Sequence, residues 1–262
     1  MTIGSGGYVL INPGKPVIVD VDVEGDGKLT EINIPVSIVD LPRAKRETTS
    51  FEFRFERPWD GKWQLQGSYV WSRSYGNYEG GVKSDNGQND TGLTQDFDEP
   101  GWMDGSTGLL PNNRTHAFKL FGSYAIKNNL IAGANLRVVS GRPYGCIGTY
   151  PKDDGRASLT GVSAWYCNLT GKDDGAKLTP RGSQFTGAWT SNLDLSLAYK
   201  LEFTKFGQST LRLDIFNVLN SQRAVDYNEI GNEADGKPNL FYRVPTQYQA
   251  PRSVRLGFSY EF

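Results

Sequence analysis

Ser253-Val-Arg-Leu-Gly-Phe-Ser-Tyr-Glu-Phe262 ends the chain, and this stretch decides the fold class. Apolar residues stand at every second position, and polar residues or glycine stand between them. Because successive side chains of a β-strand point to opposite faces, this alternation predicts a strand with one apolar face and one polar face.

The same period of two recurs upstream, in segments about as long as a strand that crosses a membrane. Between these segments lie clusters rich in Gly, Pro, Asn and Asp, which are typical of turns and loops. We therefore predict an all-β chain with about eight antiparallel strands running up and down, near residues 6–12, 47–57, 62–74, 115–126, 129–140, 188–201, 208–219 and 252–262. The first of these is the shortest, because its apolar residues are confined to 8–11.

The composition fits neither a large buried core nor disorder. Only 37% of the 262 residues are hydrophobic, yet 12% are aromatic and 31 are glycine. A disordered chain would lack those aromatic residues. The 28 Lys and Arg nearly balance the 29 Asp and Glu. This balance excludes a strongly basic nucleic-acid binder, so we expect no nucleic-acid partner.

The spacing of the predicted strands distinguishes a membrane barrel from a soluble sheet with one wet face, which would also alternate. Short connections are predicted at 58–61, 127–128 and 202–207, whereas the others, 12–46, 75–114, 141–187 and 220–251, are long. Short periplasmic turns and long extracellular loops are typical of bacterial outer-membrane barrels, whereas so many long loops are rare in compact soluble domains. The pattern predicts a transmembrane β-barrel segment in the outer membrane of a Gram-negative bacterium.

Several motifs carry a family resemblance. Arg255, Gly257, Tyr260 and Phe262 resemble the C-terminal signal by which the barrel-assembly machinery recognises its clients. Together with Leu211-Arg-Leu-Asp-Ile-Phe-Asn-Val-Leu-Asn220, the chain resembles the C-terminal end of TonB-dependent outer-membrane receptors. Further segments resemble the Oar-like branch of these receptors: Leu41–Arg46, Ser68–Arg73 with Gly76–Gly80, Leu110–His116 and Ser140-Gly-Arg-Pro-Tyr144. Members of this branch carry a carboxypeptidase-regulatory-like N-terminal domain.

The resemblance implies a 22-stranded barrel with an internal plug, driven through TonB and taking up a bulky extracellular ligand. Residues 1–262 then form the C-terminal part of such a barrel, in contact with outer-membrane lipid, while the plug, TonB box and signal peptide are absent from this sequence. The alternative is a complete small barrel of eight strands, with a structural or adhesive role through its long loops. No nucleophile constellation is present and His116 is the only histidine, so we expect no enzymatic activity.

Two candidate sites lie in the predicted loops. Asp22, Glu24 and Asp26 alternate with other residues before Gly27, and this spacing of carboxylates resembles a calcium-binding loop. The alternative is a solvated acidic hairpin tip. Apart from this candidate calcium ion, no cofactor is expected. Cys146 and Cys167 are the two cysteines, and we expect them to form a disulfide within the long 141–187 loop; two unpaired thiols are the alternative.

Overall fold

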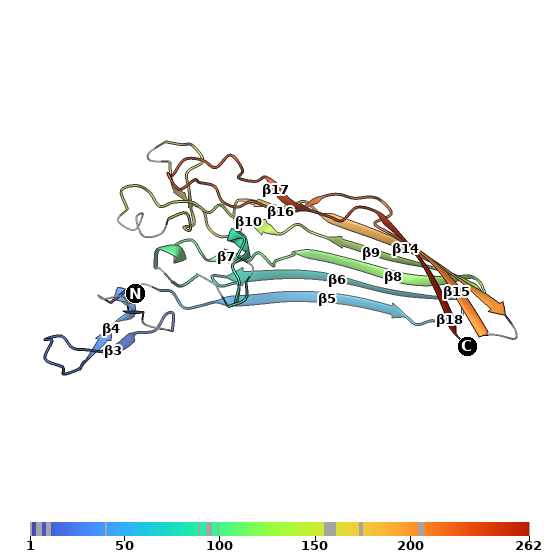
Figure 1. The fold of residues 1–262 in the computed structure, drawn as a ribbon, viewed down its shortest axis with the longest axis horizontal. Helices are drawn as coiled ribbons and strands as arrows, with labels where there is room; N and C mark the ends of the chain where they lie inside the picture. The colour runs from blue at the N-terminus through green and yellow to red at the C-terminus, as the bar shows by residue number, and fades with distance from the viewer. Residues whose placement is uncertain are drawn as a thin grey trace.

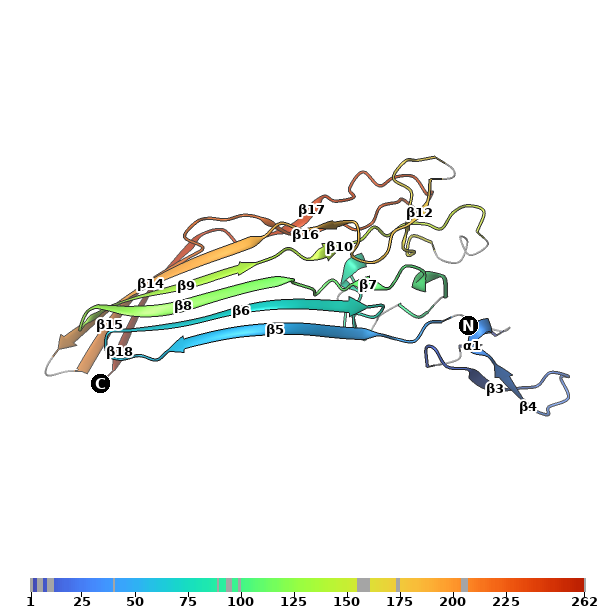
Figure 2. The same cartoon turned by 180° about the vertical axis from the view of Figure 1, so that it is seen from behind.

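Seven long antiparallel strands form one curved sheet in a computed structural model of the chain (Figures 1 and 2). The structure describes residues 2–3, 7–8, 12–39, 41–88, 90–92, 96–98, 100–154, 161–172, 175–203 and 207–261. The order across the sheet is β18-β15-β14-β9-β8-β6-β5, so each long strand lies beside its neighbour in sequence. These strands are β5 (Arg46–Arg57), β6 (Trp63–Gly76), β8 (His116–Lys127), β9 (Leu130–Val139), β14 (Thr190–Phe203), β15 (Gly207–Phe216) and β18 (Ser253–Glu261).

The described residues of the first predicted strand are not part of this sheet. They form β2 (Gly7–Tyr8), which pairs with β1 (Thr2–Ile3) in a separate hairpin, and residues 9–11 lie outside the described part. The eighth strand of the sheet is instead β7 (Gly108–Leu109), which pairs with the end of β6. This segment has only four apolar residues, Tyr8–Ile11, and they follow one another without alternation, whereas the other seven predicted strands are confirmed.

The two faces of the sheet have opposite chemistry. Across neighbouring strands, apolar side chains pair in rows such as Leu197–Leu213–Leu256, and polar side chains pair in rows such as Ser196–Asp214–Arg255. The apolar face is strongly exposed: Leu256 keeps 81% of its accessible surface. An apolar area this extensive is unfavourable in water and favourable against lipid acyl chains.

The two ends of the sheet also differ. All the long connections gather at the end near the N-terminus, here called the loop end, and the short turns lie at the opposite end with the C-terminus (Figures 1 and 2). Exposed aromatic residues lie near the turn end, as expected at a membrane interface: Trp59, Tyr124, Tyr199 and Tyr260. None of the helices in the described part of the chain is long and apolar enough to cross a membrane.

Short elements build the loop end. Two hairpins, β3–β4 and β16–β17, and the pairs β10–β13 and β11–β12 lie there. A small apolar cluster joins Val17 of β3 to Val39, Leu41 and Met103. The elements are β3 (Val17–Val21), β4 (Thr30–Ile34), α1 (Val36–Val39), η1 (Ser84–Asn86), η2 (Pro100–Met103), β10 (Pro143–Tyr144), β11 (Tyr166–Cys167), β12 (Lys177–Leu178), β13 (Phe185–Thr186), β16 (Ala224–Tyr227) and β17 (Pro245–Tyr248).

Candidate functional site

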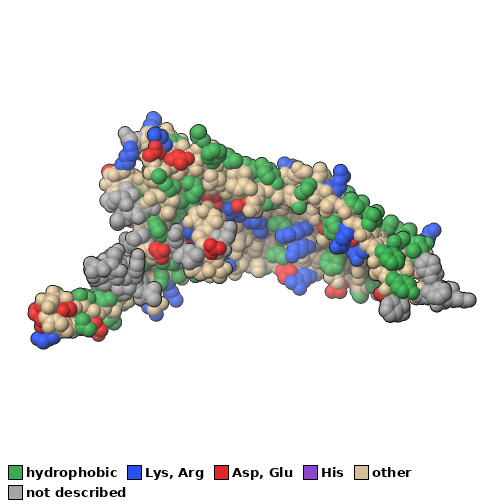
Figure 3. Space-filling view, viewed as in Figure 1, with side chains coloured by type: hydrophobic (Ala, Val, Ile, Leu, Met, Phe, Trp, Pro, Cys, Tyr) green, Lys and Arg blue, Asp and Glu red, His purple; other side chains and the backbone are tan. Residues whose placement is uncertain are grey.

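A pocket of about 590 Å³ opens on the polar face, where the sheet meets the long loops. Its walls come from β9 and β14 and from the segments that flank β8, β15 and β18 at the loop end. Lys and Arg side chains are visible in the hollow of the polar face (Figure 3). The charged residues of the described lining, which we call the arginine pocket, are Arg114, Arg137, Arg142 and Asp194.

The three arginines differ in their partners. Arg142 is buried, and its guanidinium lies 2.9 Å from the carboxylate of Glu229 and 2.7 Å from that of Asp226. Arg114 is half-buried and donates to backbone carbonyls, that of Asn113 at 3.0 Å among them. Burial lowers the pKa of Arg114, and the nearby cations of Arg142 and Arg137 add to this effect.

Arg137 extends from β9 into the pocket and is exposed. Within the described part of the chain, neither its guanidinium nor that of Arg114 forms an ion pair with a carboxylate. The polar face therefore presents two positive side chains to the pocket without a counterion from the same described residues.

Asp194 is the one acidic residue of the described lining, and N–H groups surround it. Its carboxylate accepts the side-chain amide of Asn192 at 2.6 Å and the backbone N–H of Asn217 at 2.8 Å. Asn217 has a φ of 49°, a left-handed conformation that asparagine tolerates better than most residues. Its own side chain bonds Ser221 and Ala250, so it links the end of β15 to the segment before β18. This network holds the pocket wall in place.

The motif Ser140-Gly-Arg-Pro-Tyr144 forms another wall, and its Ser140, Gly141 and Tyr144 each lie against a different neighbour. The Ser140 hydroxyl accepts the N–H of His116 at 3.0 Å, and a side chain at Gly141 would collide with the carbonyl of Gly187. Tyr144 is buried and stacks on Phe185, with 4.8 Å between ring centroids. Burial raises the pKa of Tyr144 to about 12, so its hydroxyl stays protonated and donates to the backbone.

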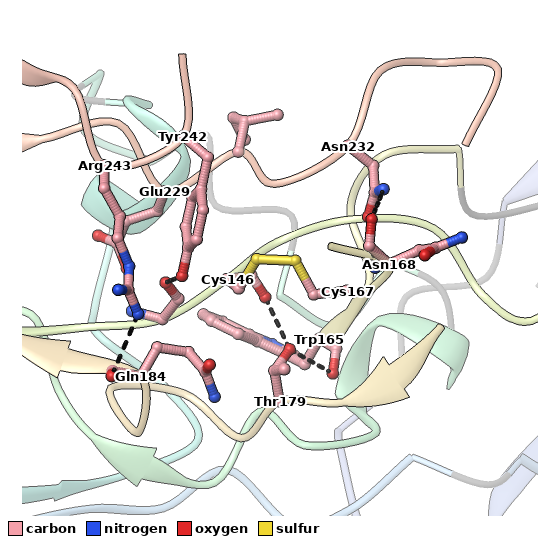
Figure 4. The surroundings of a disulfide bond; sticks show 12 residues. Cys146, Trp165, Cys167, Asn168, Thr179, Gln184, Glu229, Asn232, Tyr242 and Arg243 are labelled. Atoms are coloured by element: carbon pink, nitrogen blue, oxygen red, sulfur yellow. Dashed lines mark hydrogen bonds between the residues drawn. A yellow bond between two sulfur atoms is a disulfide. The ribbon is translucent and has the colours of Figure 1, made fainter. Parts of the chain in front are cut away.

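A disulfide joins Cys146 and Cys167 next to this wall, with 5.9 Å between the Cα atoms (Figure 4). Thr179 donates to the carbonyls of Cys146 and Trp165, which connects three parts of the 141–187 loop. Asn232 exchanges hydrogen bonds with the backbone of Asn168 and brings in the 220–251 loop. The two loops therefore pack as one body beside the pocket.

Glu229 is the buried carboxylate behind Arg142. It accepts the backbone N–H of Gly145 as well as the guanidinium, and burial raises its pKa to about 8. A second buried network joins Lys83 and Arg181 to Asp85 and Asp96, with Trp165 beneath both cations. Sequence reasoning missed both networks, because their partners are up to 96 residues apart, as Asp85 and Arg181 are, and no local pattern marks them.

The predicted calcium loop lies at the tip of the β3–β4 hairpin, away from the pocket. The carboxylate of Asp22 accepts the backbone N–H groups of Gly25, Asp26 and Gly27, which lower its pKa, that of Gly27 most. Asp26 pairs with Lys28. Over the described ranges, no group of three or more His, Cys, Asp or Glu residues is arranged to hold a metal ion. The calcium site stays a prediction without support from this geometry.

The residues of the predicted assembly signal lie on β18. Arg255 donates to Asp214 through Nε at 3.0 Å and Nη2 at 2.8 Å. Gly257 has open space beside it, since an added Cβ would find its nearest atom, the Cβ of Arg212, at 3.8 Å. Tyr260 is exposed on the apolar face, and Phe262 lies outside the described residues. Recognition of these residues by the assembly machinery stays a prediction.

No family model matches the chain. A curated relative, the TonB-dependent transporter Oar of Myxococcus xanthus, is 27% identical over 262 residues, covering 85% of this chain and 23% of its own length. The chain is thus similar in sequence to a TonB-dependent transporter. The resemblance expected from its motifs is thereby confirmed, as is the predicted location in the outer membrane of Gram-negative bacteria.

Two solved structures are also similar to the chain. The outer membrane transporter YddB from Escherichia coli matches 95% of this chain and 28% of its own, with a TM-score of 0.48 and 15% identity. The ferric-catecholate import receptor Fiu from Escherichia coli K12 matches 92% and 22%, with a TM-score of 0.40 and 15% identity. The chain thus spans about a quarter of the length of the proteins that it matches.

Proposed function

We propose that residues 1–262 are the C-terminal part of a TonB-dependent transporter that takes up a bulky ligand across the outer membrane. In this role the chain has no enzymatic activity of its own. It supplies barrel wall, polar lumen and extracellular loops, and lipid covers its apolar face. A plug and a TonB box outside this sequence couple it to TonB, and the barrel-assembly machinery inserts it.

The observation that carries this proposal is the state of the two sheet edges. Within the described residues, β5 pairs only with β6, and β18 pairs only with β15. Apolar side chains on both edge strands are exposed, with Phe51 at 72% and Leu256 at 81%. Lipid tolerates no open strand edge, because unpaired backbone groups there have no water to bond. Both edges must therefore be paired in the membrane, and in a larger barrel further strands pair with β5 and with β18.

A small barrel would instead close through direct pairing of β5 with β18. Cysteines at Phe53 and Leu256, both on the apolar face, distinguish the two closures in the full-length protein. We expect no disulfide between them after mild oxidation, because other strands intervene. A matched pair at Leu197 and Leu213, which are direct neighbours on β14 and β15, is the positive control. Efficient cross-linking of Phe53→Cys to Leu256→Cys would contradict the larger barrel.

Coupling to TonB is tested with a single cysteine on the polar face. Ser196→Cys lies on β14 beside the hollow of the sheet, and a small membrane-impermeant maleimide applied to intact cells is the probe. We expect faster labelling when TonB is active than in a strain without TonB, because energised movement of the plug opens the lumen. Leu197→Cys, on the opposite and lipid-facing side, is the control and should label slowly in both strains. Equal labelling of Ser196→Cys in the two strains would contradict TonB coupling.

A further inference from the structure

We propose that the arginine pocket binds an oxyanion group of the transported ligand, a carboxylate, phosphate or sulfate, between Arg114 and Arg137. The inference deepens the proposed function and rests on it, because it names the chemical class of the ligand. The pocket lies where the polar face meets the extracellular loops, so a ligand arriving from outside reaches it before the deeper lumen.

The described lining of the pocket has more positive than negative side chains. Three arginines face one aspartate among the described lining residues. Arg142 is held by Glu229 and Asp226 from behind, and Asp194 is surrounded by N–H donors. Arg114 and Arg137 therefore remain as the two cations whose charge no described carboxylate pairs with. Like charges held together on one wall repel each other, and a bound anion relieves that repulsion.

The shape of an arginine side chain suits an oxyanion. A guanidinium offers a planar fork of N–H donors that matches the two oxygens of a carboxylate, phosphate or sulfate. Arg114 is already oriented, since its Nη1 donates to the carbonyls of Asn113 and Pro111. Arg137 extends from a regular strand and makes no side-chain hydrogen bond within the described residues. One cation is thus fixed in place and the other is available to close on the anion.

The size of the pocket limits what enters it. A volume of about 590 Å³ is within the range of small-molecule sites, and is too small for a bulky ligand as a whole. The pocket therefore takes an acidic terminal group, while the rest of the ligand contacts the loops. Amide side chains in the same lining, those of Asn135, Asn192 and Gln249, suit a polar group beside the anion.

Calorimetric titration of the purified full-length protein in detergent tests the proposal. The probes are inorganic phosphate, sulfate and D-glucuronate, with D-glucose as the neutral comparison. We expect the anions to bind and glucose not to bind, with affinity that falls as sodium chloride is raised. Arg114→Gln and Arg137→Gln should each weaken binding by about tenfold, because each removes a charge-assisted contact. Binding of D-glucuronate alone would assign the anion to a carboxylate, and binding of phosphate or sulfate alone would assign it to those groups.

Arg54→Gln is the matched control, because Arg54 lies on β5, outside the pocket, and pairs with Glu52. It should bind the anions as the unaltered protein does. Arg137→Lys retains the charge but not the fork, so binding should fall less than in Arg137→Gln. Heat-dependent migration on gels shows that each variant is folded. If Arg137→Gln does not fold, Arg137→Lys and the salt dependence provide the decisive readings.

Three results would overturn the proposal: no anion binding, unchanged binding in both glutamine variants, or an equal loss in Arg54→Gln. None of these results affects the TonB-dependent labelling of Ser196→Cys. If labelling responds to TonB and anions fail to bind, only the ligand class is wrong. If anions bind in the pocket but labelling ignores TonB, the transport function is wrong.

Discussion

The guanidinium of Arg142 lies 2.9 Å from the buried carboxylate of Glu229, across 87 residues of chain. This contact joins the end of β9 to the last long loop and forms the outer support of the arginine pocket. Glu229 also accepts the N–H of Gly145, so a single side chain holds two points at the start of the 141–187 loop. Its protonation is therefore coupled to the order of the loop end.

Burial raises the pKa of Glu229 from 4.5 to about 8, so the folded loop holds a proton that the unfolded loop releases. The stability from this group is complete below about pH 4.5 and is lost as the pH rises through about 8. We expect hydrogen-exchange protection of residues 142–148, corrected for the intrinsic rate, to fall between these values. Glu229→Gln, which stays neutral, should flatten the profile. A wild-type profile that is already flat would contradict this expectation.

The disulfide between Cys146 and Cys167 limits the freedom of the 141–187 loop. The loop-closure model assigns a bond of this separation about 3 kcal/mol of local stability. We expect the double variant Cys146→Ser/Cys167→Ser to be cut by trypsin within this loop while the strands stay protected. Reduction of the unaltered protein should produce the same fragments, and unchanged resistance after reduction would show that the hydrogen bonds of Thr179 and Asn232 suffice.

Asn217 combines a left-handed backbone with three side-chain hydrogen bonds to Ser221 and Ala250. Asn217→Ala loses these bonds and strains the backbone, at a cost of about 2–4 kcal/mol. Asn217→Gly removes the strain and keeps only the loss of the bonds, so it should be the more stable of the two. Urea unfolding in detergent, followed by tryptophan fluorescence, measures the difference. Equal stability of the two variants would show that backbone strain contributes nothing.

Gly141 and Gly257 provide a matched pair of glycines. Gly141→Ala would place a methyl group against the carbonyl of Gly187, which must then move away from the pocket wall. Gly257→Ala meets no such obstacle, because the nearest atom is 3.8 Å away. We expect Gly141→Ala to lower the melting temperature of the folded protein and Gly257→Ala to leave it unchanged. The reverse order would contradict the close approach of Gly141 to Gly187.

The same substitution on β18 tests the assembly signal. If the machinery reads Gly257, Tyr260 and Phe262, then Gly257→Ala and Tyr260→Ala should lower the amount of protein in outer membranes. The melting temperature of Gly257→Ala should stay the same, because its folded structure has room for the methyl group. Membrane fractionation with quantitative blotting gives the amount. Normal amounts of both variants would remove the signal from this strand.

Most of the sheet could be predicted from the chain alone, since the long strands lie within a few residues of their predicted bounds. The motif Phe216-Asn-Val-Leu-Asn220 was recognised through family resemblance, and the structure supplies its physical reason, because Asn217 and Asn220 both adopt positive φ. The described residues of the first predicted strand pair instead with β1 in a separate hairpin. Four consecutive apolar residues, Tyr8–Ile11, favour extended backbone, but they do not specify the partner strand.

The alternation of apolar and polar residues by itself determined the strands, their two faces and the order of their up-and-down course. It could do so because side-chain direction along a strand depends only on local backbone geometry. The tertiary structure alone decided the pocket, the pairing of Arg142 with Glu229 and the buried network of Lys83, Asp85, Asp96 and Arg181. Those contacts depend on the path of long loops through space, and nothing local in a sequence records that path.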